Sequence, residues 1–245
     1  MPLITHPSSP GAGGAMTGKV AVISGASEGI GAGLVAGYRG RGWAVVASAL
    51  IIEPTEDPGM LAVEGDLTDP ASANRVIDSA LDRFGRIDTL VNNTAVVISK
   101  PFTDYTAADY ALVVEVTFSG FFWVTQRAIT EMAVRYGGHV VNVSAGDSGA
   151  PAVLAALTKG GLTAATRSLA VEYASLDIRV NAVLLGPSDA PAYAPGSCEH
   201  CGDRLPPLGR VGQVSDVVNG VLFLESSPCI TGETLHIDGG QTAAI

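Results

Sequence analysis

The sequence predicts an α/β domain built on one doubly wound, parallel sheet of seven strands. From Lys19 onward, short runs rich in β-branched residues alternate with longer Ala-rich stretches of helical character, a rhythm typical of βαβ units. The length of 245 residues suits a single domain, because sheets covered by helices on both faces commonly reach this size. The predicted strands are Val20–Ser24, Ala44–Ser48, Leu61–Glu64, Thr89–Asn92, His139–Ser144, Arg179–Leu184 and Thr234–Ile237.

Two of the intervening helices can be delimited from the sequence. Asp69 followed by Pro70 predicts a helix start, since the carboxylate accepts hydrogen bonds from unpaired N–H groups and Pro in the first turn has no N–H to lose. A long helix is expected from about Ala107 to Tyr136. Its middle, Phe118 to Val124, is apolar on nearly every face, which predicts burial on both sides.

Composition and charge exclude several classes of function. The formal net charge is −10 and the pI near 4.7, so the chain lacks the clustered basic residues that bind nucleic acid or anionic lipid. Only 16% of residues are charged and the mean hydropathy is +0.33. Such a chain has little polar surface, and we expect part of its apolar surface to be buried against other subunits.

The ends and loops of the chain carry further expectations. Residues 1–16 are expected to form a disordered tail without the features of a signal peptide, and residues 17–245 the domain. The longest run without a charge or a breaker, Trp43 to Ile52, has ten residues, so no transmembrane helix is expected, because a span needs roughly 20. Three Cys cannot all pair, which favours a cytoplasmic location. The Pro-rich stretch 186–209 is expected to be a functional substrate loop.

A glycine-rich turn follows the first predicted strand. It reads Ser24-Gly25-Ala26-Ser27-Glu28-Gly29-Ile30-Gly31. Missing side chains at such a turn allow backbone N–H groups and a helix N-terminus to approach a pyrophosphate. A tight turn without a ligand is the alternative, but the strand before and the helix after favour a dinucleotide site.

Further motifs follow in order along the chain. They are Gly65-Asp66-Leu67, Asn92-Asn93-Thr94-Ala95, Gly138 to Ser144, Arg179 to Gly186 and Ile230 to Gly240. Together with the glycine turn, they resemble the short-chain dehydrogenase/reductase family over residues 18 to 240. The resemblance implies a Rossmann-type fold that binds NAD or NADP. The cofactor contacts it implies are Gly25, Ser27, Glu28, Gly29, Ile30, Gly31, Asp66, Leu67, Asn92, Thr94, Lys159, Gly186 and Ser188.

The implied catalytic site departs from the family's pattern. The family places a Tyr four residues before the active-site Lys, and here Lys159 is preceded by Ala155, with no Tyr between Tyr136 and Tyr173. Thr117 stands where the family has Asn, and Ser144 remains of the usual Ser pair. The resemblance therefore implies an atypical member whose catalytic residues are Ser144, Lys159 and Thr117.

Three hypotheses for function remain open from the sequence. The first is NAD(P)-dependent oxidoreduction of a carbonyl/alcohol pair on a small apolar substrate, the second a cofactor-binding scaffold without turnover, and the third a non-redox cyclisation, isomerisation or dehydration. A replacement general acid would restore hydride chemistry. The candidates are Ser144, Thr117, Asp147, Ser148, Tyr193, Cys198, His200 and Cys201. The Cys198-Glu199-His200-Cys201 cluster lacks the second ligand pair of a structural zinc site, and no metal is expected.

The sequence does not decide between NAD and NADP, and it implies an oligomer. The second strand ends in Ala49 and Leu50, neither the acid that favours NAD nor a basic residue for the 2′-phosphate of NADP. Glu28 would oppose that phosphate, while Arg39 and Arg41 lie nearby in sequence, so the choice stays open. The family resemblance implies a homo-oligomer, a dimer or tetramer, with the apolar contacts Phe121, Phe122 and Trp123.

Overall fold

A parallel sheet of seven strands forms the centre of the molecule. The computed structural model describes residues 18–94, 96–145, 153–189 and 205–244. The strands lie in the order β3-β2-β1-β4-β5-β6-β7, all parallel. Their bounds are Val20–Ser24 (β1), Ala44–Ala49 (β2), Met60–Glu64 (β3), Thr89–Asn92 (β4), Gly138–Ala145 (β5), Ile178–Leu185 (β6) and Thr234–Ile237 (β7). The predicted fold class is confirmed, with strand ends shifted by at most one residue.

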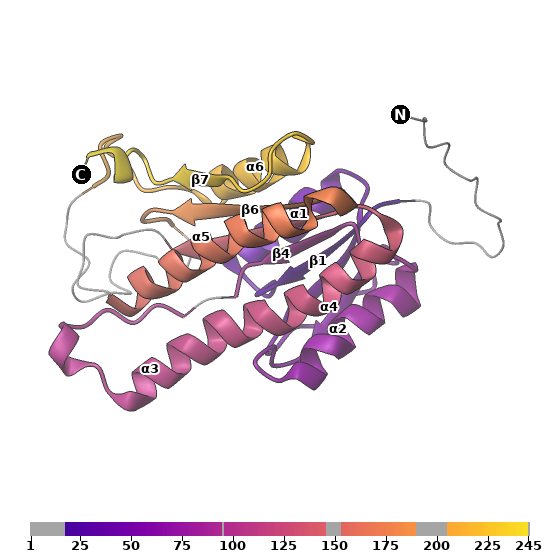
Figure 1. The fold of residues 1–245 in the computed structure, drawn as a ribbon, viewed down its shortest axis with the longest axis horizontal. Helices are drawn as coiled ribbons and strands as arrows, with labels where there is room; N and C mark the ends of the chain where they lie inside the picture. Colours follow the sequence, from indigo (N-terminus) through magenta and orange to yellow (C-terminus); the bar gives the residue numbers. More distant parts are fainter. Residues whose placement is uncertain (1–17, 95, 146–152, 190–204, 245) are drawn as a thin grey trace.

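Helices cover both faces of the sheet (Figure 1). The helices α1 (Gly29–Gly40) and α6 (Val214–Glu225) pack on one face, whereas α2 (Pro70–Phe84), α4 (Gly120–Arg135) and α5 (Val153–Tyr173) pack on the other. Short helical turns lie at Phe102–Asp104, Ala174–Leu176 and Thr242–Ala244. The central strands are therefore buried on both faces, which explains why they read as continuous apolar runs.

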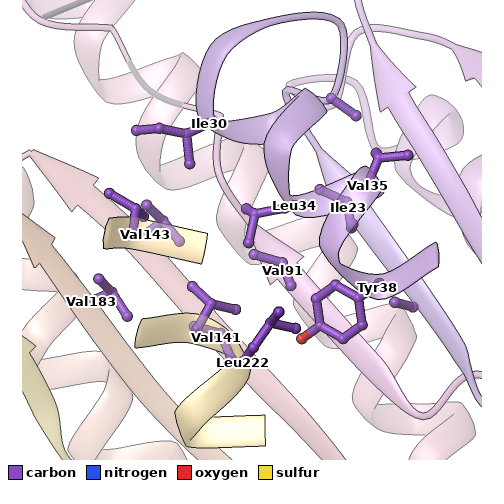
Figure 2. Packing of buried hydrophobic residues seen from close by; sticks show 14 of the residues in the cluster. Ile23, Ile30, Leu34, Val35, Tyr38, Val91, Val141, Val143, Val183 and Leu222 are labelled. Atoms are coloured by element: carbon purple, nitrogen blue, oxygen red, sulfur yellow. The ribbon is translucent and has the colours of Figure 1, made fainter. Parts of the chain in front are cut away.

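Two apolar clusters form the core, one on each side of the sheet. Figure 2 shows the first, in which Leu34 and Tyr38 of α1 and Leu222 of α6 pack on Ile23 and other inward-facing strand residues. The second joins α2 and α4 to the opposite sheet face through side chains that include Ile77. Strict alternation along the strands decides which side chains enter which cluster.

The start of α2 follows the predicted capping pattern. The carboxylate of Asp69 accepts hydrogen bonds from the backbone N–H groups of Ala71, at 3.2 Å, and Ser72, at 3.0 Å. Pro70 occupies the first turn, and Gly85 ends the helix in the left-handed region at φ 76°. The cap prediction is confirmed.

The long helix expected from Ala107 to Tyr136 is present with an irregular turn in its middle. It comprises α3 (Ala107–Val114), a π-helical turn η2 (Glu115–Ser119) and α4, and it ends at Arg135. The expectation that Phe118 to Val124 is buried on both sides is wrong for the single protomer, because Val124 is buried while Phe122 is 50% exposed. Only one side of this stretch packs on the sheet and α2.

This same helix is the most apolar long helix that bears on the expectation of no transmembrane segment. Within the described parts of the chain, Ala107–Arg135 is long and apolar enough to cross a membrane by length and hydropathy alone, with 22% of its most apolar window buried. The helix contains no long run without a charge, because isolated charged residues such as Asp109 and Glu115 divide it. The expectation of no transmembrane helix, which was based on the length of such runs, did not consider it. Val124 and Ile129 pack it into the second core cluster.

A buried polar network lies at the amino-terminal edge of the sheet. The Glu225 carboxylate, at the end of α6, accepts hydrogen bonds through Oε2 from Thr89 Oγ1 at 2.7 Å, His139 Nδ1 at 3.0 Å and Tyr38 Oη at 3.1 Å. The side chains of His139 and Glu225 are only 2% and 6% exposed. Beneath them, Arg179 donates to the carbonyl oxygens at the end of α6. The network thus ties α1 and α6 to β4, β5 and β6.

Candidate dinucleotide site

A pocket of about 420 Å³ opens at the carboxyl ends of β1 to β4. The strand order reverses between β1 and β4, and such a switch point is where open α/β sheets bind ligands. The lining comes from the glycine turn, three strand ends and α3–η2. Its residues are Gly25, Ser27, Glu28, Gly29, Ile30, Ala49, Leu50, Gly65, Asp66, Leu67, Thr68, Asn93, Thr94, Val96, Leu112 and Val116.

The glycine turn has a backbone that other residues would not tolerate. Gly25 and Gly29 have φ values of +60° and +54°, in the region that favours glycine. A Cβ atom at Gly31 would lie 1.9 Å from the carbonyl oxygen of Gly25. The close approach of α1 to the end of β1 therefore requires glycine at position 31.

Among the residues that the structure describes, no side chain caps the first turn of α1. Glu28 occupies the N-cap position in an extended conformation and makes no capping hydrogen bond with its side chain. The first N–H groups of a helix have no partner within the helix and favour an anion. Here they face the pocket together with Ser27 and Gly29, as a pyrophosphate site requires.

The glycine turn is held in place by the end of β4. The Ser24 hydroxyl accepts a hydrogen bond from Asn93 N at 3.0 Å, and Asn93 Nδ2 donates to the Gly25 carbonyl at 3.1 Å. Asn93 also lines the pocket. The sequence-based site omitted Asn93, although its place directly after a strand at the switch point was a usable signal.

The far end of the pocket combines apolar walls with a carboxylate. Leu112 and Val116, four residues apart on α3–η2, line the pocket together with residues that follow β3. Asp66 is exposed there, and its Oδ1 accepts a hydrogen bond from Thr68 N at 2.9 Å. A flat aromatic base fits between such walls. Leu112 and Val116 were missing from the predicted site, and their i, i+4 spacing was the only available signal.

Asn92 lies beside the pocket rather than in its lining. Its Nδ2 donates to Thr125 Oγ1 at 2.9 Å and to Asn142 Oδ1 at 2.8 Å, and Asn142 donates to Thr166 Oγ1 at 2.9 Å. These buried bonds join β4 to α4, β5 and α5. Direct contact between Asn92 and a cofactor stays a prediction, while its observed contacts position the strand end.

The three predicted catalytic residues lie on separate elements outside the 420 Å³ lining. Ser144, near the end of β5, and Thr117, in the π-helical turn, are 5% and 4% exposed. Thr117 Oγ1 is buried without a hydrogen-bond partner among the described residues, and π-helical turns inside α-helices are frequent at functional sites. Lys159 lies half-buried on α5.

The helix α5 approaches the π-helical turn closely beyond Lys159. A Cβ atom at Gly161 would lie 2.8 Å from the Phe118 ring, so glycine allows this contact. Ala155 stands one turn before Lys159, and its carbonyl accepts a hydrogen bond from Thr158 Oγ1 at 3.0 Å. Ala155 therefore lies within α5 and presents only a methyl group one turn before Lys159.

The remaining predicted residues fall into two groups. Gly186 and Ser188 are both buried after β6, and a Cβ atom at Gly186 would lie 2.7 Å from Asp238 Cα. The tail 1–16 and most of the loop 186–209 lie outside the described residues, as do six candidate acids. These are Asp147, Ser148, Tyr193, Cys198, His200 and Cys201.

A family model described as enoyl-(acyl carrier protein) reductase matches residues 25–242. The cis-4-hydroxycyclohexanecarboxylate dehydrogenase of Sinomonas cyclohexanicum is 33% identical over 249 residues, covering 94% of this chain and 99% of that protein. The 3beta-hydroxysteroid dehydrogenase 1 of Eggerthella lenta is 31% identical over 248 residues, covering 93% and 95%.

Solved structures resemble the chain over a similar length. The 3-ketoacyl-(acyl-carrier-protein) reductase from Brucella melitensis, complexed with NADH, superposes with a TM-score of 0.82 at 26% identity, covering 92% of this chain and 98% of that one. ElxO with NADP bound gives a TM-score of 0.84 at 24% identity, covering 93% and 100%. At this level of identity, the likeness to ElxO concerns the fold alone.

Proposed function

Because the chain belongs to the short-chain dehydrogenase/reductase family, we propose that it is an NAD(P)-dependent oxidoreductase with a non-standard active site. The reaction proposed is the interconversion of a carbonyl and an alcohol on a small apolar substrate. The observation that carries the proposal is the glycine cradle, in which Gly31 leaves no room for a Cβ atom and α1 has no side-chain cap. Gly31 allows α1 to approach the end of β1 closely, and this packing brings the first turn of the helix to the pocket, where a pyrophosphate can bind.

The described residues fit a nicotinamide dinucleotide. The glycine turn and the first N–H groups of α1 would hold the pyrophosphate. The walls formed by Leu112 and Val116 would hold the adenine, with Asp66 at its edge. When bound, the nicotinamide supplies or accepts the hydride.

The catalytic half of the proposal depends on three side chains. We assign the ribose contact to the Lys159 ammonium and the hydrogen bond to the substrate oxygen to the Ser144 hydroxyl. The Thr117 hydroxyl, buried and unpartnered within the described structure, is proposed to donate its proton to the substrate oxygen on reduction and to regain one from water. Because Ala155 cannot donate a proton, we expect slow turnover, since a positioned acid typically contributes about 10² to 10⁴ in rate.

The substrate class is proposed from charge and from the relatives. Only 16% of residues are charged and the net charge is −10, which argues against a phosphorylated substrate. Two relatives are named as dehydrogenases of a hydroxycyclohexanecarboxylate and of a hydroxysteroid. Both names denote a secondary alcohol on a ring, and a compact cyclic ketone is the first substrate to test.

A second candidate function is favoured by the helical Ala155. With a methyl group where the family has its acid, the chain is suited to bind a cofactor without redox turnover, as a partner or regulatory subunit. A non-redox cyclisation, isomerisation or dehydration in the same pocket is a further alternative. Both alternatives predict cofactor affinity without reduction of any carbonyl.

Titration and turnover distinguish these candidates. The purified protein is titrated with NADH and NADPH, and a panel of cyclic ketones is then followed by absorbance of the reduced nicotinamide. Lys159→Ala should weaken cofactor binding, and Arg167→Ala, an exposed residue on the same helix, is the matched control. Binding without turnover on any ketone would refute the redox proposal and favour the two alternatives without redox turnover. Ala155→Tyr asks whether the pocket still suits ordinary carbonyl reduction.

We also propose that the protein is a cytoplasmic homo-oligomer, with the dimer and the tetramer as the candidate states. The helices α4 and α5 expose large apolar side chains, among them Phe122 at 50%, Leu157 at 58% and Val171 at 82%. Exposed apolar surface of this kind is typical of subunit contacts. Cys229 is exposed as a free thiol, which is compatible with a reducing compartment.

A further inference from the structure

We propose that a buried network of four polar side chains sets the register of the elements that carry the active site, with Asn142 as the positioning residue at its centre. The members of this network, which we call the Asn–Thr network, are Thr125, Asn92, Asn142 and Thr166. The inference rests on the proposed function, because it concerns how the three proposed catalytic side chains are held relative to one another.

Three hydrogen bonds connect the four side chains. Asn92 Nδ2 donates to Thr125 Oγ1 at 2.9 Å and to Asn142 Oδ1 at 2.8 Å. Because the Asn142 oxygen accepts that bond, its Nδ2 is turned toward α5 and donates to Thr166 Oγ1 at 2.9 Å. Asn92 is 8% exposed and the other three side chains at most 3%. Water therefore does not compete for these bonds, and in such surroundings they are strong.

The members of the network stand on different elements of the proposed site. Thr125 lies on α4, which continues the π-helical turn that holds Thr117. Asn142 precedes Ser144 by two residues on β5, so both side chains point to the same face of the sheet. Asn92 ends β4, next to the pocket. The network thus joins the elements that bring the reacting groups and the cofactor pocket together.

Thr166 fixes the height of Lys159 beside the sheet. The two residues are seven positions apart on α5, which is about two turns, so they lie on one face roughly 10 Å apart along the axis. The helix runs back antiparallel to β5, because it connects β5 to its parallel neighbour β6. Lys159 and Ser144 therefore both lie on the carboxyl-terminal side of the bond between Asn142 and Thr166. That bond sets how far they stand from each other.

Apolar packing does not fix this register. The buried residues of α5 recur at every fourth position, and they are Leu154, Thr158, Leu162, Thr166 and Ala170. Such a stripe repeats with each turn, and apolar contacts have no preferred direction. A hydrogen bond holds its donor and acceptor between about 2.7 and 3.2 Å. A single buried Asn sets the register of coiled coils for the same reason.

Stability alone does not account for the amide of Asn92. Its Nδ2 uses both hydrogens within the network, but its Oδ1 is buried without a hydrogen-bond partner among the described residues. A buried acceptor without a partner destabilises the folded state. An apolar side chain would avoid this penalty, whereas only the amide can hold α4 and β5 at fixed distances from β4.

The test cuts the network at α5 alone. Thr166→Val removes the hydroxyl and nearly keeps the shape of the side chain, whereas Thr166→Ser keeps the hydroxyl. Ile77→Val, a truncation in the second core cluster on α2, is the matched control for lost stability. Each variant is measured at a temperature at which circular dichroism shows it fully folded, so that a loss of stability by itself changes no affinity.

NADH is titrated into the full-length protein and followed by nicotinamide fluorescence. Thr166→Val should weaken NADH binding about threefold or more, because a displaced Lys159 loses part of a charged hydrogen bond. Thr166→Ser and Ile77→Val should bind NADH as the native protein does. In a Lys159→Ala background, Thr166→Val should cause no further loss, since independent effects would add.

Turnover of a cyclic ketone gives a second readout. Thr166→Val should lower kcat about tenfold to a hundredfold with a smaller change in KM, because misplacing reacting groups by about 1 Å can cost that much in rate. Thr166→Ser should restore kcat. Equal kcat in Thr166→Val and the native protein would overturn the inference.

Crystal structures of the native protein and the variants test the register without any cofactor. Superposed on the sheet, α5 should be displaced relative to β5 in Thr166→Val and unmoved in Thr166→Ser. An unmoved α5 in Thr166→Val, or a loss of NADH affinity that persists undiminished in the Lys159→Ala background, would overturn the inference and leave the proposed function intact. If the native protein binds no cofactor, the proposed function fails, whereas a displaced α5 would still support the role of the network.

Discussion

Glu225 offers the sharpest test of what holds the two helical layers to the sheet. Its Oε2 atom accepts three hydrogen bonds from side chains on α1, β4 and β5. Replacing it by Ala leaves the hydroxyls of Tyr38 and Thr89 and the ring N–H of His139 unpaired in the interior. Leaving a buried donor without its partner costs about 1–3 kcal/mol, and with three such donors we expect Glu225→Ala to lose about 3 kcal/mol or more of unfolding free energy.

Glu225→Gln separates the charge from the hydrogen bonds. An amide oxygen in the place of Oε2 can still accept from the three donors, but bonds to a charged acceptor contribute about 1.5–3 kcal/mol and neutral ones about 0.5–1.5. We expect the Gln variant to lose about 1–3 kcal/mol, less than Ala. Glu53→Ala, an exposed acid, should stay within about 0.5 kcal/mol.

The proton positions in this network set the direction of its pH dependence. Glu233 N donates to Asn181 Oδ1, which turns Asn181 Nδ2 toward His139 Nε2 at 3.1 Å. His139 Nε2 therefore accepts, and the proton sits on Nδ1, facing Glu225. Burial lowers the pKa of His139 below its usual 6.5, with Glu225 only partly opposing this effect. Burial alone would raise the pKa of Glu225, but hydrogen bonds, above all from His139, outweigh it and hold the pKa below 4.5.

Both lowered pKa values act in the same direction. Each group contributes stability above its unfolded pKa, near 6.5 for His139 and 4.5 for Glu225, and loses it as the pH falls through the folded value. Urea unfolding followed by circular dichroism, at fixed protein concentration and several pH values, measures this. The advantage of the native chain over Glu225→Gln should shrink at acid pH. A loss of less than about 1 kcal/mol of unfolding free energy in Glu225→Ala at pH 7 would refute the reasoning. Three buried donors without partners should destabilise the protein by more than that.

Three further predictions follow from single contacts. Gly31→Ala should cost about 1–3 kcal/mol of stability and abolish cofactor binding in a titration, because its Cβ atom would lie 1.9 Å from a backbone oxygen. The control is Gly40→Ala on the same helix, which has open space around the added Cβ atom and should be neutral or stabilising. Thr117→Val should keep or raise the melting temperature, because the hydroxyl has no partner within the described structure. It should slow turnover about tenfold or more if that hydroxyl relays a proton. A loss of melting temperature that accompanies the loss of turnover would make Thr117 purely structural. Phe122→Glu should shift the sedimentation profile to smaller species, and a native protein that sediments only as a monomer would contradict the proposed assembly.

The sequence alone determined the sheet and the glycine turn after β1, because both depend on local patterns. Buried parallel strands require continuous β-branched runs, and the glycine turn requires missing side chains at fixed spacing. Seven strands and the Asp69 cap were readable for this reason. Eight of the contacts that the family resemblance implied, such as Gly25 and Asp66, line the pocket.

Only the tertiary structure decided how distant segments meet. The apolar wall of Leu112 and Val116, the burial of Asn92 and the three donors around Glu225 each bring together residues from separate elements. The sequence also predicted burial around Phe122 on both sides, whereas the fold of one protomer leaves that ring half exposed. Periodicity reports that a face is apolar but not what covers it, since the covering surface comes from another part of the chain or from another subunit.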